Sequence, residues 1–127
     1  MMKAAGALAL CGALLAGASL PAQAAPAPKA KLKIVDGMKG GPVKSVWLHC
    51  GPAGGTHPNA RAACNLLRQV KGDPAQLKVS PKANCSQEIK PHAVAIAGTW
   101  HGRKVHWAKF FANACQMRAM TGPILAL

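Results

Sequence analysis

Residues 50–64 have the sequence C-G-P-A-G-G-T-H-P-N-A-R-A-A-C, in which a run of glycines and prolines follows the first of two cysteines. The preceding residues, Val43–Cys50, form a short stretch of alternating character, as in a half-buried strand. Gly51–Gly55 predicts a loop, because glycine and proline interrupt regular structure. The chain is therefore expected to leave a strand at the first cysteine of this stretch.

A helix is predicted to follow this loop. Thr56 or His57 can cap its first turn, Pro58 suits its first position, and Gly72 closes it. Apolar side chains repeat along one helical face at Ala60, Ala63, Cys64, Leu67 and Val70. The second cysteine of the stretch is thus placed on the buried side of the helix.

Further strands are predicted on both sides of this helix, because short alternating stretches recur there. They occupy residues 32–35, 92–97 and 99–109. Gly98 separates the last two, Gly37–Pro42 predicts a turn, and His101–Gly102 predicts a tight hairpin turn.

The remaining segments complete the expected domain. Asp73–Ala83 is loop-like, with room for one helical turn, and Phe110–Met120 can hold a short helix that carries Cys115. Ile124–Leu127 predicts a final apolar strand. A helix-rich connection among several antiparallel strands indicates an α+β fold.

The N-terminus has the features of a Sec-type signal peptide over residues 1–24. Lys3 supplies positive charge, Ala4–Ala18 is almost wholly small and apolar, and an A-x-A cleavage site follows. Residues 25–31 form a flexible Pro/Ala/Lys tail, and residues 32–127 form one small domain. The apolar run is too short for a membrane span, so we expect a secreted protein without membrane insertion.

Removal of this signal leaves an even number of cysteines: Cys50, Cys64, Cys85 and Cys115. Cysteines in a small exported domain normally form disulfides, and four of them allow three pairings. Each disulfide is expected to contribute on the order of 3 kcal/mol.

The charge of the chain is strongly basic. Sixteen Lys and Arg residues stand against three acids, and the formal net charge is +13. Such a field favours anionic partners, among them nucleic acid, an anionic cell surface or an acidic protein. The basic residues are scattered singly and without an aromatic-rich motif, so we do not expect nucleic-acid binding.

The sequence offers no convincing catalytic, metal or cofactor site. His92, His101 and His106 lie close in sequence, but no pair has helical spacing with a nearby carboxylate, and the acids that orient metal ligands are scarce. No nucleophile elbow is present, and disulfides account for the mature cysteines. We therefore expect a protein that is not an enzyme and has no cofactor.

Several motifs in order carry a family resemblance. Cys50–Cys64 contains G-T-H-P-x-A followed by A-C, and Val70–Leu77 contains G-D-x-x-x-L. Gly98–Arg103 has the pattern G-x-W-x-G-[KR], and Phe111–Cys115 the pattern F-x-N-x-C. Together they resemble the Streptomyces subtilisin inhibitor family over nearly the whole expected domain.

This resemblance implies a five-stranded antiparallel sheet with two short helices and two disulfides, usually as a homodimer. It implies the pairings Cys50–Cys64 and Cys85–Cys115. It also implies inhibition of subtilisin-like serine proteases by an exposed loop that enters the active site like a substrate, with the reactive bond at Gln87–Glu88. The other loop residues are Asn84, Cys85, Ser86, Ile89, Lys90 and Pro91.

The local sequence suits that role. Cys85 anchors the loop two residues before the expected bond, and Pro91 restricts Lys90 to extended conformations on the other side. A loop already held in its bound shape loses little entropy on binding. The resemblance further implies that the side chain of Asn113 braces the loop by hydrogen bonding.

Gln87 and Glu88 depart from the residues common in the family. A bond at Glu88–Ile89 would suit a glutamate-specific protease instead. Two other functions use the same scaffold: a non-inhibitory basic module held on an anionic envelope, and a transglutaminase substrate with Gln87 as acyl donor.

Overall fold

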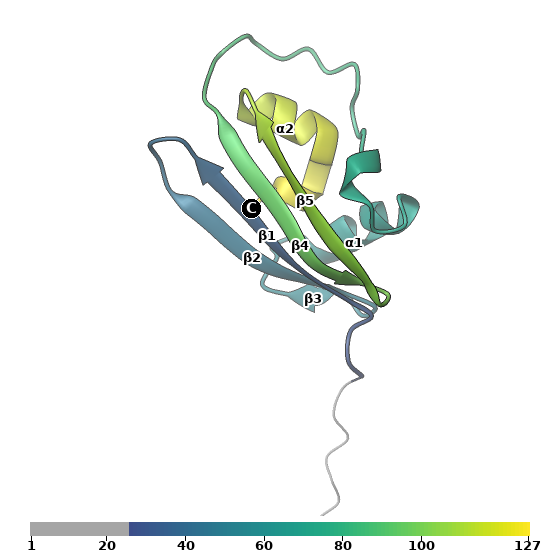
Figure 1. The fold of residues 1–127 in the computed structure, drawn as a ribbon. Helices are drawn as coiled ribbons and strands as arrows, with labels where there is room; N and C mark the ends of the chain where they lie inside the picture. The colour runs from purple at the N-terminus through teal and green to yellow at the C-terminus, as the bar shows by residue number, and fades with distance from the viewer. Residues whose placement is uncertain (1–25) are drawn as a thin grey trace, which may run out of the picture.

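The computed structural model describes residues 26–127, so the expected signal peptide lies outside the described residues. It contains a five-stranded antiparallel sheet in the order β3-β2-β1-β4-β5 (Figure 1). The strands are β1 (Ala30–Met38), β2 (Val43–Cys50), β3 (Gly54–Gly55), β4 (His92–Trp100) and β5 (Arg103–Phe111). The helices are α1 (Ala60–Gln69) and α2 (Ala114–Thr121), with 3-10 turns η2 (Pro74–Gln76) and η3 (Gly122–Leu125). The α+β class and the five-stranded sheet are confirmed.

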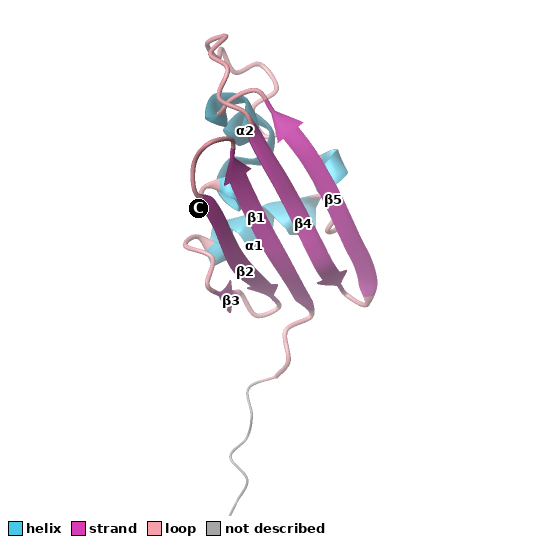
Figure 2. Cartoon of the chain, turned by 60° about the vertical axis from the view of Figure 1, so that its left-hand side comes forward, coloured by secondary structure: helices cyan, strands magenta, loops and turns pink. Residues whose placement is uncertain are grey.

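The helices lie together on one face of the sheet, and the other face is open (Figure 2). Alternate residues of β1 point toward the helices, where Leu32 and Ile34 are fully buried. They pack with Leu48, Ile96, Leu67, Met117, Ile124 and Leu125 in one hydrophobic core. Burial of these apolar side chains supplies the main stabilisation of the domain.

β1 is the central strand and begins at Ala30, two residues before the expected start of the domain at Leu32. Ala30 pairs with Cys50 on β2 and with Trp100 on β4, which draws it into the sheet. Just before it, the carbonyl of Lys29 accepts a hydrogen bond from the backbone of His101 at 2.8 Å.

Helix α1 buries Ala63, Cys64 and Leu67, as its periodicity predicts. The predicted cap was wrong: Asn59, and neither Thr56 nor His57, is the N-cap residue. The Thr56 hydroxyl accepts from the backbone of Trp47, and the His57 ring is buried, with Nε2 2.8 Å from the carbonyl of Ile124. Both side chains therefore tie the turn to other parts of the fold.

The helix ends at Gln69 with Val70 as its C-cap, and Lys71 (φ +55°) precedes the predicted closing residue, Gly72. The position of Gly72 has a tertiary cause as well. It has φ +77°, and its N–H donates to the carbonyl of Leu67 at 2.8 Å. A Cβ on this residue would lie 2.2 Å from the ring of Trp100, so any side chain here would collide with the core.

The expected final strand at Ile124–Leu127 was wrong. Pro123, which has no N–H for a strand ladder, follows Gly122 (φ +52°), and the chain forms η3 there. Ile124 and Leu125 are buried in the core. The fifth strand is instead β3, which pairs with β2 inside the expected Gly/Pro loop.

Gly98 does not separate two strands, contrary to expectation, but lies within β4. It has φ +151°, and a Cβ there would lie 2.1 Å from the carbonyl oxygen of Lys31 on β1. Glycine thus permits the close approach of two central strands. The predicted tight turn is confirmed at His101 and Gly102, both with positive φ, as in a type I′ hairpin.

Two disulfides are present, Cys50–Cys64 and Cys85–Cys115, the pairings that the resemblance implies. The first joins the end of β2 to α1, and the second joins the loop before β4 to the start of α2. Across residues 26–127, no helix combines the length and apolar character needed to cross a membrane.

Candidate functional site

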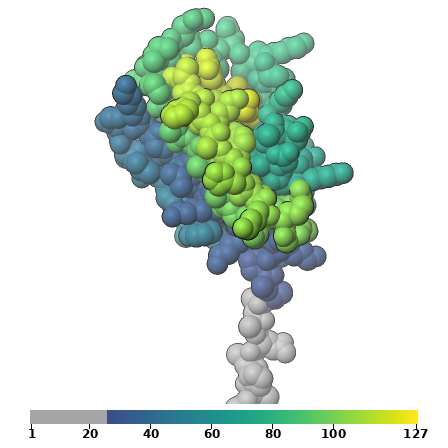
Figure 3. Space-filling model, viewed as in Figure 1, coloured from purple at the N-terminus to yellow at the C-terminus, as the bar shows by residue number. Residues whose placement is uncertain are grey.

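The segment before β4 is an extended loop without regular secondary structure over residues 83–91. It lies at the end of the molecule away from the start of β1 (Figure 3). Its side chains are exposed, except that Cys85 and Pro91 are half-buried, and Ile89 is 71% exposed. A loop with apolar and polar side chains turned outward offers them to a partner.

Two backbone contacts hold the chain that leads into this loop. The N–H groups of Val79 and Ser80 donate to the carbonyls of Met120 and Ala119, at 3.2 and 2.6 Å. The Cys85–Cys115 disulfide, with a Cα–Cα distance of 5.7 Å, then fixes the loop to α2. The chain that enters the loop is therefore fastened to α2 alone, by the disulfide at the start of this helix and by two hydrogen bonds near its C-terminal end.

The exit side is fastened to other elements. The N–H of Lys90 donates to the carbonyl of Ala112 at 2.8 Å, just after β5. The N–H of Lys39, in the β1–β2 hairpin, donates to the carbonyl of Pro91 at 3.1 Å. These contacts, together with the restricted backbone before proline, keep the exit extended.

Asn113 connects the loop to the core from beneath. Its side chain is buried, and its Nδ2 donates to the carbonyl of Ser86 at 3.1 Å and to that of Glu88 at 2.8 Å. Its Oδ1 accepts from the backbone of Gln116 at 2.9 Å and so caps α2. The amide uses both of its N–H donors on the loop, and the helix cap fixes its orientation.

Gln87 lies between the two carbonyls that Asn113 holds. It is exposed, and none of the hydrogen bonds found in residues 26–127 involves it. The neighbouring Glu88 forms an ion pair with Lys90, with 3.6 Å between Oε1 and Nζ. Both side chains of that pair are more than half exposed, so the pair contributes little to stability.

A hollow of about 300 Å³ lies behind the loop, lined by Met38, Glu88, Lys90, His92 and Asn113, among other residues. His92, one of its lining residues, has its ring Nδ1 2.7 Å from Oδ1 of Asp36, in a buried pair between β4 and β1. The loop is thus held in place by a disulfide and hydrogen bonds rather than by close packing.

The structure brings together all the residues expected to form this site. Asn84, Cys85, Ser86, Gln87, Glu88, Ile89, Lys90 and Pro91 form the loop, and Asn113 lies beneath it. Sequence reasoning missed the backbone anchors at Val79, Ser80, Lys39 and Ala112, because a main-chain hydrogen bond requires no particular side chain.

The histidines do not assemble into a metal site. Within residues 26–127, no group of three His, Cys, Asp or Glu side chains could hold a metal ion. His92 is buried beside Asp36. His101 is exposed in the turn between β4 and β5, and His106 is exposed on β5.

Comparison with known proteins adds sequence and structural relatives. A family model described as subtilisin inhibitor-like matches residues 28–113. The chain is 41% identical over 123 residues to a subtilase-type protease inhibitor of Streptomyces coelicolor, covering 89% of this chain and 85% of that protein. It is 44% identical over 86 residues to a subtilisin inhibitor of Streptomyces violaceus, covering 66% of this chain and 59% of that protein.

A solved structure has the same fold. It is Streptomyces caespitosus sermetstatin in complex with Bacillus licheniformis subtilisin, with a TM-score of 0.61 and 29% sequence identity. The match covers 77% of this chain and 98% of that one.

Proposed function

Because this chain belongs to the subtilisin inhibitor-like family, we propose that it is a secreted inhibitor of subtilisin-like serine proteases rather than an enzyme. The loop Asn84–Pro91 enters the protease active site, and Gln87–Glu88 is the reactive bond. The observation that carries this proposal is the pair of hydrogen bonds from Asn113 to the carbonyls on both sides of Gln87.

The loop binds as an extended substrate strand. Its main chain forms hydrogen bonds with the protease, and alternate side chains occupy pockets. Contacts with Asn113, Ala112 and Cys115 already hold the loop in the free protein. Binding is tight because few rotations remain to be lost on association.

The same contacts make cleavage slow to complete. When the protease serine attacks the carbonyl of Gln87, the leaving amine belongs to Glu88. The carbonyl of Glu88 is held by Asn113, and the other side of the bond is held through Cys85. The new amine therefore stays beside the acyl-enzyme, where it re-forms the bond in competition with attack by water.

The side chains next to the bond define which proteases fit. Gln87 has no charge for a trypsin-type pocket, whereas a broad subtilisin-type pocket accommodates an uncharged side chain of this length. Glu88 presents an acid just after the bond, and Lys90 is its ion-pair partner within the loop.

The primary experiment titrates subtilisin with the disulfide-bonded mature protein. We expect a stoichiometric, slowly reversible complex with the wild type, and none with Gln87→Pro, because proline changes the backbone at the reactive residue. Gln87→Leu is the matched control: it retains the loop backbone and should still inhibit. Full activity of subtilisin, trypsin and glutamyl endopeptidase at excess wild-type protein would falsify the proposal.

Mass spectrometry of the complex after long incubation locates the bond. A single cleavage between Gln87 and Glu88 supports the proposed assignment. Cleavage between Glu88 and Ile89 would instead reassign the reactive residue to glutamate and point to a glutamate-specific target.

We also propose that the protein is exported and pairs as a homodimer. Export is supported by the disulfides, which persist in oxidising compartments. A second copy fits the apolar end of the open sheet face, which carries Val35, Val43, Ala95, Ala108 and the 80% exposed Phe110. Sedimentation velocity should detect a dimer that Phe110→Ser weakens, and a monomer at all accessible concentrations would exclude it.

A further inference from the structure

A hollow of about 550 Å³ lies between helix α2 and the chain that enters the loop Asn84–Pro91. Figure 1 shows the segment between η2 and β4 arching over α2. Two backbone hydrogen bonds and the Cys85–Cys115 disulfide fix this segment near the two ends of the helix. We call the space the entry hollow and define it by six lining residues: Lys78, Ala83 and Asn84 from the entering chain, and Gln116, Ala119 and Met120 from α2.

The lining of the entry hollow combines apolar surface with free hydrogen-bond donors. Its apolar members are two alanines and a methionine. Among the hydrogen bonds and ion pairs found within residues 26–127, none uses the side chain of Lys78, Asn84 or Gln116. An ammonium group and amide N–H groups donate, and a carboxylate accepts through both of its oxygens. A carboxylate is therefore the group that these three side chains can bind together.

The surface around the entry hollow is positively charged. None of the residues within 26–127 that line it is acidic, and Lys82 is exposed in the adjoining turn. Asp36 is buried in the interior, and Asp73 lines a separate hollow. Glu88 is paired with Lys90 in the loop. The electrostatic field at the entry hollow thus favours an acidic partner.

The entry hollow is continuous with the surface that the protease would cover. Protease–inhibitor interfaces typically include about 20–30 residues on each side, which is more than the loop Asn84–Pro91 supplies. Asn84 and Cys85 belong both to the loop and to the lining of the hollow, and the proposed reactive bond follows at Gln87. A protease bound at this bond therefore brings the rim of its cleft beside the entry hollow.

We propose that the entry hollow binds a carboxylate on an acidic surface segment of the target protease. Lys78 is its ionic partner, and the amides of Asn84 and Gln116 are further donors. The site adds to the proposed inhibition, on which it rests, the chemistry of the partner: the protease carries this acidic segment beside the part of its cleft that receives the residues before the reactive bond.

A second copy of this chain suits the entry hollow poorly. It contains three acids against sixteen Lys and Arg residues, and among its described residues only Asp73 and Glu88 are exposed acids. Two such copies repel one another at long range. An acidic protease is instead attracted, and a close interfacial charge pair then slows its dissociation.

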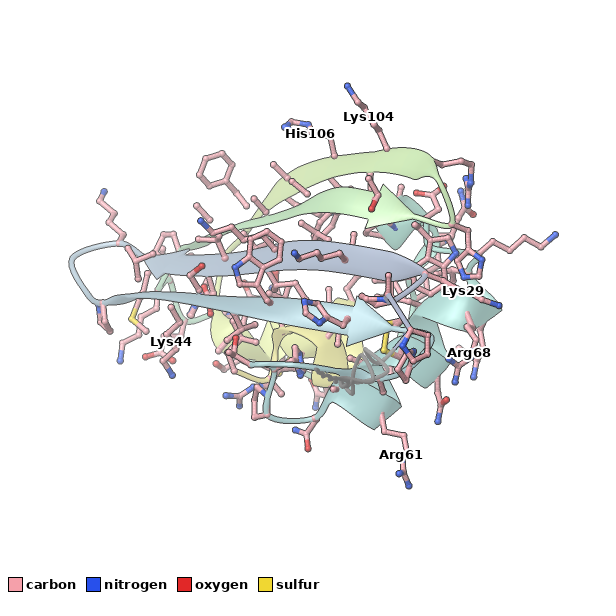
Figure 4. All side chains as sticks on the ribbon, turned by 90° about the horizontal axis from the view of Figure 1, so that it is seen from below. Lys29, Lys44, Arg61, Arg68, Lys104 and His106 are labelled. Carbon is pink, nitrogen blue, oxygen red and sulfur yellow. A yellow bond between two sulfur atoms is a disulfide. The ribbon has the colours of Figure 1, made fainter. Side chains whose placement is uncertain are left out.

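The test uses the subtilisin-like protease that the mature, disulfide-bonded protein inhibits most strongly, chosen from a purified panel that includes subtilisin. Lys78→Met removes the charge and keeps the length of the side chain, and Lys78→Glu reverses the charge. Lys29→Met and Lys29→Glu are the matched controls. Figure 4 shows Lys29 at one end of the sheet and Lys44 at the other, and it is at the Lys44 end that Lys39 contacts Pro91 of the loop.

We expect Lys78→Met to weaken inhibition by about tenfold and Lys78→Glu by about a hundredfold at low salt, because removal of one partner from a close charge pair has effects of this size. Each Lys29 control should change it less than about twofold, since solvent and salt screen a distant charge. At high salt the association rates of all variants should converge. Thermal unfolding checks that every variant is folded.

Cross-linking identifies the partner of Lys78 directly. A carbodiimide joins a lysine amine to a carboxylate in contact with it, with loss of water and without a spacer. Mass spectrometry of the treated complex should find Lys78 joined to an Asp or Glu of the protease. The Lys78→Met complex should lack this product.

Three outcomes would overturn the proposal while the wild type still inhibits. The first is an equal loss in the Lys78 and Lys29 variants, which indicates only the overall charge of the protein. The second is unchanged or stronger inhibition by Lys78→Glu, which means that no acidic segment faces the hollow. The third is a cross-link from Lys78 to a second copy of the inhibitor. Absence of inhibition by the wild type is distinct from these, because it overturns the proposed function and this site with it.

Discussion

The two disulfides of this protein lie in contrasting surroundings. Cys50 and Cys64 are 1% and 0% exposed and belong to the hydrophobic core. Cys85 is half-buried and Cys115 is exposed, directly beside a loop with no regular structure. One bridge therefore lies where the fold is packed, and the other where the proposed protease would bind.

Chain entropy alone does not distinguish them. The loops that they close span 14 and 30 residues. By loop closure these correspond to about 3 and about 3.6 kcal/mol, a small difference. The two disulfides differ in their contacts. Cys50–Cys64 packs within the hydrophobic core, whereas Cys85–Cys115 holds the loop together with Asn113. This contrast predicts that stability and inhibition can be changed separately.

The largest expected effect is on stability, in the variant Cys50→Ala with Cys64→Ala. The free energy of unfolding should fall by about 3–5 kcal/mol, because the cross-link and buried sulfur contacts are both lost. Denaturant unfolding measures this change. Inhibition by the molecules that remain folded should be unchanged, and a matching loss of inhibition would contradict the separation.

The second effect is on the loop, in the variant Cys85→Ser with Cys115→Ser. The entry side of the loop would lose its anchor, and the protease should hydrolyse it about a hundredfold faster, equivalent to about 2.8 kcal/mol. Inhibition should then decay with time. The assay is recovery of subtilisin activity, with mass spectrometry of the cleaved loop. Persistent inhibition at the wild-type level would show that hydrogen bonds alone hold the loop.

The third effect separates the two tasks of Asn113. Asn113→Ser keeps an oxygen to cap α2 but cannot reach the carbonyls of Ser86 and Glu88. Loop hydrolysis should rise by about thirtyfold, since two hydrogen bonds of about 1 kcal/mol each are lost. Asn113→Ala should give the same hydrolysis rate and lose about 1 kcal/mol more stability, through the missing cap. Equal unfolding energies for the two variants would refute this division.

The smallest effect concerns the exposed pair of Glu88 and Lys90. Lys90→Gln should change the free energy of unfolding by less than about 0.5 kcal/mol, because solvent screens exposed charges. Thermal unfolding at low and high salt measures it. A loss above about 1 kcal/mol would mean that the side chain of Lys90 supports the loop in another way.

Local patterns predicted much of the fold. Alternation placed the cores of β1, β2, β4 and β5, and helical periodicity identified the buried side of α1. These predictions succeeded because side chains at fixed spacing face the same way whatever the rest of the chain does. The disulfide pairing did not follow from local patterns. Four cysteines allow three pairings, and the family resemblance selected one of them.

Errors occurred where a distant segment decided the local conformation. Gly98 resembles a strand boundary, but it is required by the carbonyl of Lys31 on the neighbouring strand. His57 resembles a helix cap, but its ring lies between the N–H of Asn59 and the carbonyl of Ile124 near the C-terminus. The apolar end at Ile124–Leu127 resembles a strand, but Ile124 and Leu125 are buried in the core, and the strand at the edge beside β2 is β3.

For the candidate site, the sequence by itself placed Cys85 and Pro91 on the two sides of the expected loop, and the family resemblance implied the loop residues and the support from Asn113. Only the tertiary structure decided how they act together: Asn113 reaches carbonyls on both sides of Gln87, and Lys90 and Pro91 are held by different backbone segments. It alone also placed Lys31, Lys33 and Lys104 on the same face of the sheet. The physical reason is that side-chain identity and spacing are local, whereas hydrogen-bond partners and surface charge depend on which strands become neighbours.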